Sequence, residues 1–251
     1  MGGINRPAVC LTIGGSDSCG GAGIQADLRM FDRIGVRGCS AITALTAQSP
    51  AMIARIEVVS IAQLAAEISS VFNFFDVKVV KTGMLVDAGH VDCVATALQQ
   101  YHDARPLIVD PVMVASSGRR LLDEQAFDVL RHTLLPQATL ITPNLNEAAV
   151  LSGGHLYADD GAEMAASLAL QYRTAVLVKG GHGHGPRLHD FLCDSHGEMH
   201  LFSHPTQAWN QDQAHGTGCR LAAAIAAFMM KKSELPQACR QAIHSLLKNG
   251  N

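Results

Sequence analysis

The segment HGTGCRLAAA, residues 215 to 224, contains groups that could act on a negatively charged ligand. Gly216 and Gly218 leave backbone N–H groups unobstructed at the beginning of a long apolar helical run. A helix N-terminus presents unpaired donors and a partial positive charge, so it is suited to hold an anion. Cys219 could be a nucleophile, a base or a packing residue. A glycine-rich turn entering a buried helix is the alternative interpretation, and the pentapeptide HGTGC alone does not decide between the two.

Oxygen and nitrogen side chains suited to phosphate chemistry follow three other apolar runs. Asp110 precedes a proline, and Asn144 and Glu147 stand in the segment NLNE. Carboxylates in such numbers, completed by water, are the ligands that Mg²⁺ prefers, although Asn144 is equally a natural helix N-cap. Lys179 ends an apolar run and precedes Gly180, so its ammonium could face a phosphate, although an exposed lysine at a strand end would look the same.

A glycine-rich segment near the beginning, GGSDSCGGAGIQAD, lacks the spacing of a dinucleotide-binding loop, and no phosphate-binding loop of the G-x-x-x-x-G-K-[ST] type occurs in the chain. Glycines ahead of a helix still permit close approach of a ligand to the backbone. Asp27 falls one turn into the expected helix and could point back towards that ligand, or it could be an ordinary acidic residue near a helix beginning.

Short apolar runs alternate with longer segments of helical period. This alternation predicts βαβ units and a mainly parallel sheet covered by helices on both sides, in one domain spanning residues 1–251. The expected strands are residues 9–13, 77–81, 107–112, 140–142 and 175–179. The expected helices are residues 22–34, 61–74, 88–101, 123–134 and 160–172. Residues 189–203 contain two short runs around a Ser-His-Gly turn, which predicts an antiparallel hairpin at one sheet edge.

The polar and glycine-rich segments follow the five expected strands. In open parallel sheets, ligands bind beyond the carboxyl ends of the strands. We therefore expect the five strand exits to form the rim of one active site, although ordinary loops after strands also favour Gly, Pro and Asn.

Composition narrows the choice of partner. The 251 residues are 48% hydrophobic and 16% charged, with a formal net charge of −3 and no basic stripe, which argues against nucleic acid and favours a small-molecule partner. The seven cysteines are far apart and form no C-x-x-C pair, which predicts reduced thiols. No run is apolar for long enough to cross a membrane, and the first residues do not form a signal peptide, so the expected location is the cytoplasm.

Seven segments in unbroken order resemble the hydroxymethylpyrimidine and phosphomethylpyrimidine kinases of thiamine biosynthesis, a branch of the ribokinase-like superfamily. The segments are LTIGGSDSCGGAGIQADL at 11–28, TALTAQ at 43–48, KTGML at 81–85, VDPVMVASSG at 109–118, LLPQATLITPNLNEA at 134–148, VLVKGGH at 176–182 and HGTGC at 215–219. The resemblance implies a ribokinase-like three-layer α/β/α fold and a homodimer.

The implied reaction is the ATP-dependent phosphorylation of 4-amino-5-hydroxymethyl-2-methylpyrimidine and of its monophosphate. The same resemblance implies a set of ring-binding residues: Gly15, Ala22, Asp27, Gln48, Met84 and Val112. We expect an apolar residue at the position of Gln48 in the related pyridoxal kinases. Gln48 therefore favours the aminopyrimidine over pyridoxal.

The resemblance also implies the phosphate-binding residues. Asp110 and Glu147 would hold Mg²⁺, and the nucleotide would contact Asn144, Glu147, Lys179 and Arg220. The backbone of Gly216, Thr217, Gly218 and Cys219, with Lys179, would stabilise the transferred phosphoryl group. Cys219 occupies the position of the aspartate base of many sugar kinases, so we expect it to act as a modest base or to orient the attacking hydroxyl.

Two residues around this motif depart from the family pattern. Ala214 replaces the usual threonine, and Arg220 places a cation in the first helical turn, where a bound anion would offset its unfavourable position. The alternatives to the pyrimidine kinase are a pyridoxal kinase and a pyrimidine sensor that has lost turnover.

Overall fold

The computed structural model describes residues 6–101, 105–115, 118–154, 161–180 and 186–248. Within these residues the chain forms one sheet of nine strands in the order β3-β2-β1-β4-β5-β6-β7-β8-β9. The strands are β1 (Ala8–Asp17), β2 (Gly38–Ser49), β3 (Met52–Val58), β4 (Asp76–Thr82), β5 (Leu107–Val109), β6 (Leu140–Ile141), β7 (Ala175–Val178), β8 (Arg187–Cys193) and β9 (Met199–Pro205).

The strand pairings from β2 through β7 are parallel, whereas β3 pairs antiparallel at one edge and β8 and β9 pair antiparallel at the other. The mainly parallel sheet and its edge hairpin are therefore confirmed. The five predicted strands are the adjacent strands β1, β4, β5, β6 and β7. Strands β2 and β3 were not predicted.

The helices follow the strands along the chain. They are α1 (Gly23–Ile34), α2 (Ile61–Phe74), α3 (Ala88–Gln100), α4 (Glu124–Val129), α5 (Leu145–Leu151), α6 (Gly161–Tyr172), α7 (Gln211–Ala214), α8 (Thr217–Met230) and α9 (Leu235–Lys248). A π-helical turn, Leu130–Leu134, continues α4, so the single helix predicted for residues 123–134 is two helical segments. None of the described helices is long and apolar enough to cross a membrane.

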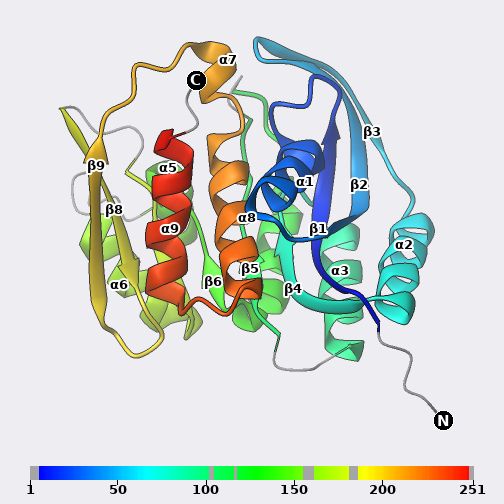
Figure 1. The fold of residues 1–251 in the computed structure, drawn as a ribbon. Coiled ribbons are helices and arrows are strands. Elements are labelled where there is room, and N and C mark those ends of the chain that lie inside the picture. The colour runs from blue at the N-terminus through cyan, green and yellow to red at the C-terminus, as the bar shows by residue number, and fades with distance from the viewer. Residues whose placement is uncertain (1–5, 102–104, 116–117, 155–160, 181–185, 249–251) are drawn as a thin grey trace.

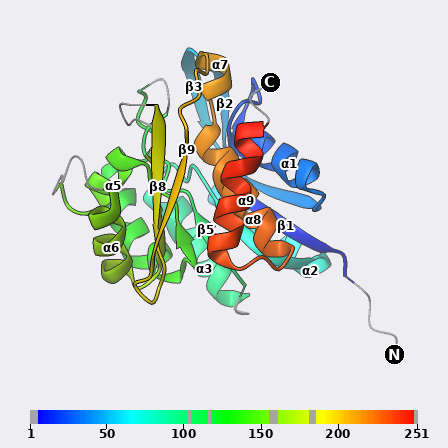
Figure 2. The same ribbon diagram turned by 60° about the vertical axis from the view of Figure 1, so that its left-hand side comes forward.

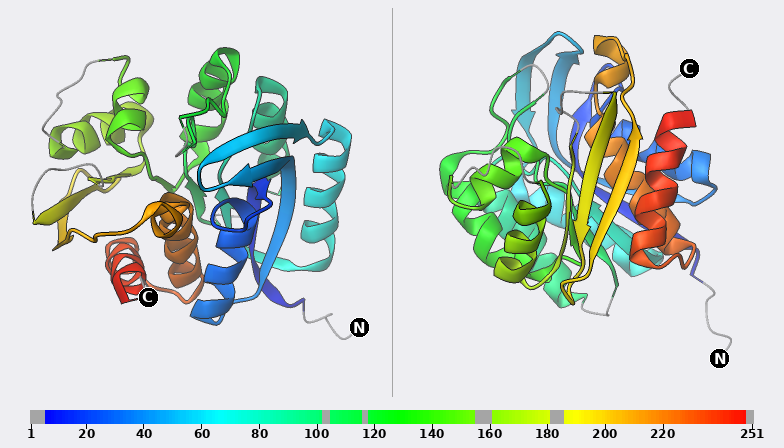
Figure 3. Two further views of the ribbon diagram at one scale, coloured as in Figure 1. Left: turned by 90° about the horizontal axis from the view of Figure 1, so that it is seen from above. Right: turned by 90° about the vertical axis from the view of Figure 1, so that its left-hand side faces the viewer.

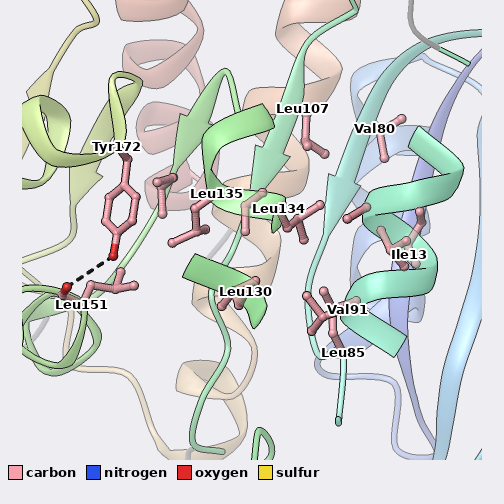
Figure 4. Packing of buried hydrophobic residues seen from close by; sticks show 14 of the residues in the cluster. Ile13, Val80, Leu85, Val91, Leu107, Leu130, Leu134, Leu135, Leu151 and Tyr172 are labelled. Carbon is pink, nitrogen blue, oxygen red and sulfur yellow. Dashed lines mark hydrogen bonds between the residues drawn. The ribbon is translucent and has the colours of Figure 1, made fainter. Parts of the chain in front are cut away.

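Helices cover both faces of the sheet, which gives three layers (Figures 1 and 2). Helices α1, α8 and α9 pack on one face, and α2 to α6 pack on the other. Within β5, Leu107 and Val109 join one hydrophobic cluster while Ile108 joins the other, as the period of two in a strand requires. Figure 4 shows the cluster beneath α3, α4 and α6, where the hydroxyl of Tyr172 donates to the carbonyl of Leu151.

The carboxyl ends of the parallel strands all lie at the end of the sheet where α8 begins. Figure 1 shows α7 and the beginning of α8 at the top, the end towards which β1 points. The view from above in Figure 3 shows that α1, which follows β1, lies beside α8. Strand β5 stops at Val109 rather than at the predicted residue 112, since Pro111 has no N–H to donate to a neighbouring strand.

Candidate active site

A cavity of about 840 Å³ opens at this end of the sheet. Residues that follow β1, β4, β5, β6 and β7 all line it, so the prediction of one rim built from five strand exits is confirmed. Segments from β9 to the beginning of α8, and the end of α9, complete the wall. Residues 116–117 of the segment VDPVMVASSG, and residues 181–185, which follow the strand that ends near Lys179, lie outside the described residues.

Two glycines shape the beginning of α8. Gly216 is the N-cap with a left-handed φ of 74°, and a Cβ there would lie 2.1 Å from the carbonyl oxygen of Gly21. A Cβ on Gly218 would lie 3.1 Å from Nζ of Lys179. No described side chain caps this helix, so its first N–H groups stay available to an anion. The hydroxyl of Thr217 donates to the carbonyl of Ala214, which fixes the loop before the helix.

Lys179 and Asp110 form an ion pair beside Gly218. The Lys179 ammonium donates to Oδ1 of Asp110 at 3.0 Å, and the hydroxyl of Thr142 donates to the same oxygen at 3.2 Å. Burial would raise the pKa of Asp110, but Lys179 and Lys81 hold it below its usual value. Burial would lower the pKa of Lys179, but its carboxylate neighbours keep it above its usual value. The pair is therefore ionised, and it places one anion and one cation at the cavity.

Asn144 and Glu147 form a capping box at the beginning of α5. Oδ1 of Asn144 accepts from the Glu147 N–H at 2.9 Å, and Oε2 of Glu147 accepts from the Asn144 N–H at 2.8 Å. The predicted N-cap is thus confirmed. Burial raises the pKa of Glu147 to about 7; Asp110 adds to this rise and Lys179 opposes it. Two neighbouring buried carboxylates with incompletely compensated charge are a donor set that fits a hard divalent cation.

Asp27 and Lys81 form a second, fully buried ion pair, with each side chain 1% exposed. Oδ2 of Asp27 accepts from Nζ of Lys81 at 2.8 Å and from the hydroxyl of Thr12 at 2.5 Å. Among the described residues, Oδ1 of Asp27 has no hydrogen-bond partner. Lys81 was not among the predicted site residues, although its position at the end of the predicted strand, directly before the segment TGML, was the signal that could have identified it.

Cys219 lies beside these charges. Burial raises the pKa of its thiol to about 11, Lys81 opposes the rise, and Asp110 and Asp27 add to it. The thiol is therefore protonated at neutral pH. This favours the predicted hydroxyl-orienting role of Cys219 over a role as base.

The predicted ring-binding residues line the cavity together: Gly15, Ala22, Asp27, Gln48, Met84 and Val112. A Cβ on Gly15 would lie 3.0 Å from the sulfur of Met84, so this glycine permits close packing of the two segments. Asp17 and His215 were not predicted, yet both are buried and line the same region, where Nε2 of His215 lies 2.9 Å from Oδ2 of Asp17.

Arg220 contacts the loop that precedes its own helix. It does not line the cavity, and Nη2 donates to the carbonyl of Gln213 at 2.5 Å. The side chain curls back over the loop that precedes its own helix, because that loop presents carbonyl oxygens to the guanidinium. In this structure Arg220 contacts the loop that precedes α8, and its contact with a nucleotide stays a prediction.

Comparison with known proteins agrees with this geometry. Residues 17–249 match the family model described as phosphomethylpyrimidine kinase. The chain is 44% identical over 234 residues to the hydroxymethylpyrimidine/phosphomethylpyrimidine kinase of Rhizobium meliloti, covering 92% of this chain and 86% of that protein.

Solved structures of related kinases are similar to this protein in fold. The crystal structure of phosphomethylpyrimidine kinase from Clostridium difficile is similar with a TM-score of 0.83 and 32% identity, over 97% of this chain and 99% of that one. An ADP complex of pyridoxal kinase from Bacillus subtilis has a TM-score of 0.84 and 30% identity, over 96% and 90% of the two chains. The chain has the ribokinase-like fold and belongs to the phosphomethylpyrimidine kinase family.

Proposed function

We propose that the protein is an ATP-dependent kinase that phosphorylates 4-amino-5-hydroxymethyl-2-methylpyrimidine and its monophosphate in thiamine biosynthesis. The observation that carries the proposal is one cavity that joins the beginning of α8, the Lys179–Asp110 pair and the buried acceptor of Asp27. Family membership supports the reaction, and the ADP complex of the pyridoxal kinase supports a nucleotide in a site of this kind.

At the phosphate end, the protein positions groups and neutralises charge, as phosphoryl transfer requires. The attacking oxygen is the hydroxyl oxygen of the alcohol or a phosphate oxygen of the monophosphate. It forms a bond to the γ-phosphorus while the bond from that phosphorus to the ADP oxygen breaks, and the hydroxyl proton of the alcohol passes to water. The N–H groups of residues 216–219 and the Lys179 ammonium would stabilise the transferred group. Asp110 and Glu147 would hold Mg²⁺, which supplies positive charge to the nucleotide phosphates.

At the ring end, the free Oδ1 of Asp27 would accept a hydrogen bond from the exocyclic amine. A buried acceptor left without a partner costs about 1–3 kcal/mol, so a ligand donor there would be stabilising. Ala22, Met84 and Val112 would contact the faces of the ring. The nucleotide base would lie at the opposite wall, where apolar side chains from β8 to α9 line the cavity: Leu188, Pro205, Trp209, Ile243 and Leu246.

An assay of ATP consumption with three candidate substrates tests the proposal. We expect the pyrimidine alcohol and its monophosphate to stimulate ADP formation, and pyridoxal to do so much less. Turnover of pyridoxal alone would assign the protein to the pyridoxal kinases, whose ADP complex is similar in fold. Thermal stabilisation by the pyrimidine without any turnover would instead support the sensor.

We also infer that residues 1–251 form one kinase domain. We infer further that the protein is a homodimer and that it is located in the cytoplasm. Seven free cysteines support a reducing compartment. Light scattering of the purified chain tests the dimer, for which a mass of twice 26.6 kDa is expected.

A further inference from the structure

Three side chains outside the predicted phosphate site form a hydrogen-bonded row along the ring end of the cavity: Asp17, His215 and Gln48. Nε2 of His215 lies 2.9 Å from Oδ2 of Asp17 and 3.1 Å from the carboxamide nitrogen of Gln48. Asp17 and His215 are 3% and 5% exposed, so water does not compete for these contacts. The row connects the end of β1, the loop before α8 and the end of β2.

The position of the proton on His215 follows from its neighbours. Nδ1 of His215 is buried and has no hydrogen-bond partner among the described residues, whereas Nε2 faces a carboxylate oxygen. Burial would raise the pKa of Asp17, but hydrogen bonds from the backbone of Ala22, from His215 and from Cys19 hold it below its usual value. Asp17 is therefore an anion that accepts, and the imidazole proton lies on Nε2.

That proton determines which way the Gln48 carboxamide faces. The single Nε2 proton is directed to Asp17, the shorter of the two contacts, and an Nε2 that carries a proton cannot accept from the Gln48 nitrogen. The carboxamide oxygen therefore faces the ring, where it can share that proton in a bifurcated bond. The hydroxyl of Thr46 lies 2.9 Å from the carbonyl of Ser16 and 3.1 Å from the other carboxamide atom, at which the structure places the Gln48 oxygen. Because the one hydroxyl proton is directed to the shorter contact, the Thr46 lone pairs favour the Gln48 nitrogen on that side, with the two carboxamide atoms exchanged. Both neighbours select the same orientation.

We propose that His215, held by Asp17, is a positioning residue that fixes the orientation of the Gln48 carboxamide and thereby the selectivity for an aminopyrimidine ring. With one N–H donated to Thr46 and the oxygen turned towards the imidazole, Gln48 keeps one N–H and one lone pair for a ligand. An exocyclic amine beside a ring nitrogen offers the complementary acceptor and donor, and pyridoxal has no such adjacent pair. This inference rests on the proposed function.

The surrounding backbone makes the arrangement rigid. A Cβ on Gly21 would lie 2.4 Å from Cδ2 of His215, so the imidazole packs directly against a glycine. Asp17 also accepts from the N–H groups of Ala22 at 2.8 Å and Cys19 at 3.0 Å. The row is therefore fixed to the loop before α1, and loss of the imidazole would still leave Asp17 with hydrogen bonds.

A double-mutant cycle on ligand affinity tests the proposal. His215→Phe keeps a ring against Gly21 and removes the donor, and Gln48→Leu removes the carboxamide. We expect each single variant to weaken binding of the pyrimidine alcohol, measured by calorimetry without nucleotide, about 10- to 100-fold. The double variant should lose little more than either single variant, because both remove the same interaction.

Two variants, His215→Gln and His215→Asn, separate a positioning role of His215 from a packing role. The side-chain amide nitrogen in His215→Gln can reach the position of the imidazole Nε2. The shorter side chain in His215→Asn brings its amide nitrogen only to the position of Nδ1. We expect affinity to return towards the wild-type value in His215→Gln alone, with the KM for ATP unchanged within about 3-fold in all variants that fold by circular dichroism.

Three results would overturn the proposal: additive losses in the cycle, equal recovery in His215→Asn and His215→Gln, or a KM for ATP that changes as much as the affinity for the alcohol. Because ligand affinity is measured separately from turnover, failure of the proposed kinase function can be distinguished from failure of the proposal about His215. In that case the wild-type protein binds the pyrimidine alcohol and the double-mutant cycle shows the expected non-additive losses of affinity, yet no alcohol stimulates ADP formation. If the wild-type protein does not bind the pyrimidine alcohol, both proposals fail.

Discussion

At Cys219 the effect of the helix N-terminus and the effect of burial act in opposite directions on the same thiol. Unpaired N–H groups and Lys81 favour a thiolate, whereas removal from water favours the neutral form. Burial prevails and raises the pKa of Cys219 to about 11. A group that holds its proton at neutral pH is a poor acceptor for the proton of an alcohol, so its contribution is limited to contact and orientation.

Replacement of Cys219 by alanine should therefore lower kcat by less than about 100-fold, below the range of about 10² to 10⁴ that is usual for loss of a general base. Cys39→Ala is the matched control, because this half-buried thiol lies outside the cavity. Steady-state kinetics measures both variants. A 10³-fold or greater loss of kcat in Cys219→Ala, together with the loss of an ionisation from its pH–rate profile, would show that Cys219 acts as a base.

Gly218→Ala should separate activity from stability. A Cβ there lies 3.1 Å from Nζ of Lys179 and 4.0 Å from Oδ2 of Asp110, so it displaces the ammonium from the site. Alanine in a helix is favoured over glycine by up to about 1 kcal/mol. We expect kcat/KM for ATP to fall about 10-fold or more while urea denaturation shows unchanged or greater stability.

The control for that comparison is Gly216→Ala, in which the backbone is left-handed and the new Cβ meets the carbonyl of Gly21 at 2.1 Å. That variant should lose stability as well as activity. Unchanged kcat/KM in Gly218→Ala would mean that the position of Lys179 has no importance for the nucleotide.

At the scale of the element, β4 presents two lysines in different surroundings. Lys78 pairs with Asp76 at the surface, where the two side chains are 51% and 42% exposed. Lys81 pairs with Asp27 of α1, where both are 1% exposed. The apolar run at residues 77–81 predicted the strand, and the strand ends where the cavity begins. It could not predict the partner of Lys81, because Asp27 precedes it by 54 residues.

Lys81→Met should reduce the free energy of unfolding by about 3–5 kcal/mol, since it leaves the buried Asp27 carboxylate without its counter-charge. Lys78→Met, on the same strand, should change it by no more than about 1 kcal/mol. Urea denaturation of both variants measures the difference. The double variant Lys81→Met with Asp27→Leu should recover much of the loss; similar small losses in both lysine variants would contradict the assignment of a buried pair.

Other elements show where the sequence pattern was sufficient. The central strands are runs of Val, Ile and Leu buried on both faces, and all five were predicted. Strand β2 contains three alanines and a glycine among its twelve residues, so it lacks the β-branched run by which a strand is recognised. The position of β2 beside β1 depends on hydrogen bonds between residues distant in the sequence, and a local sequence pattern cannot predict such pairing.

For the whole molecule, the order of motifs predicted one rim because every parallel strand ends on the same side. The candidate site was predicted wherever a residue directly follows a strand or begins a helix, as for Asp110, Asn144 and Gly216. The contacts that orient those residues were not. Asp17, Lys81 and His215 act through partners far away in the chain, and Arg220 donates to the carbonyl of Gln213 in the loop before its own helix.

Nucleotide binding should stabilise the whole fold, because the cavity wall includes residues from β1 to α9. ADP at 100 times its Kd should add about 2.7 kcal/mol to the free energy of unfolding. Urea denaturation with and without ADP measures this increment, and Gly218→Ala at the same ADP concentration should show a smaller one. Equal increments in the two proteins would place the phosphates away from Gly218.

The contact between His215 and Asp17 also bears on the order of folding. It joins residues 198 positions apart, and the backbones of Gly21 and Gly216 meet at the same place. Such a contact gains nothing until the intervening chain is arranged, because the entropy of closing so long a loop must be offset first. The ring end of the cavity is therefore expected to form last, after the sheet. A nascent chain still lacking the HGTGC segment would have no complete site for the pyrimidine, so the protein begins to bind it only after this segment has been synthesised.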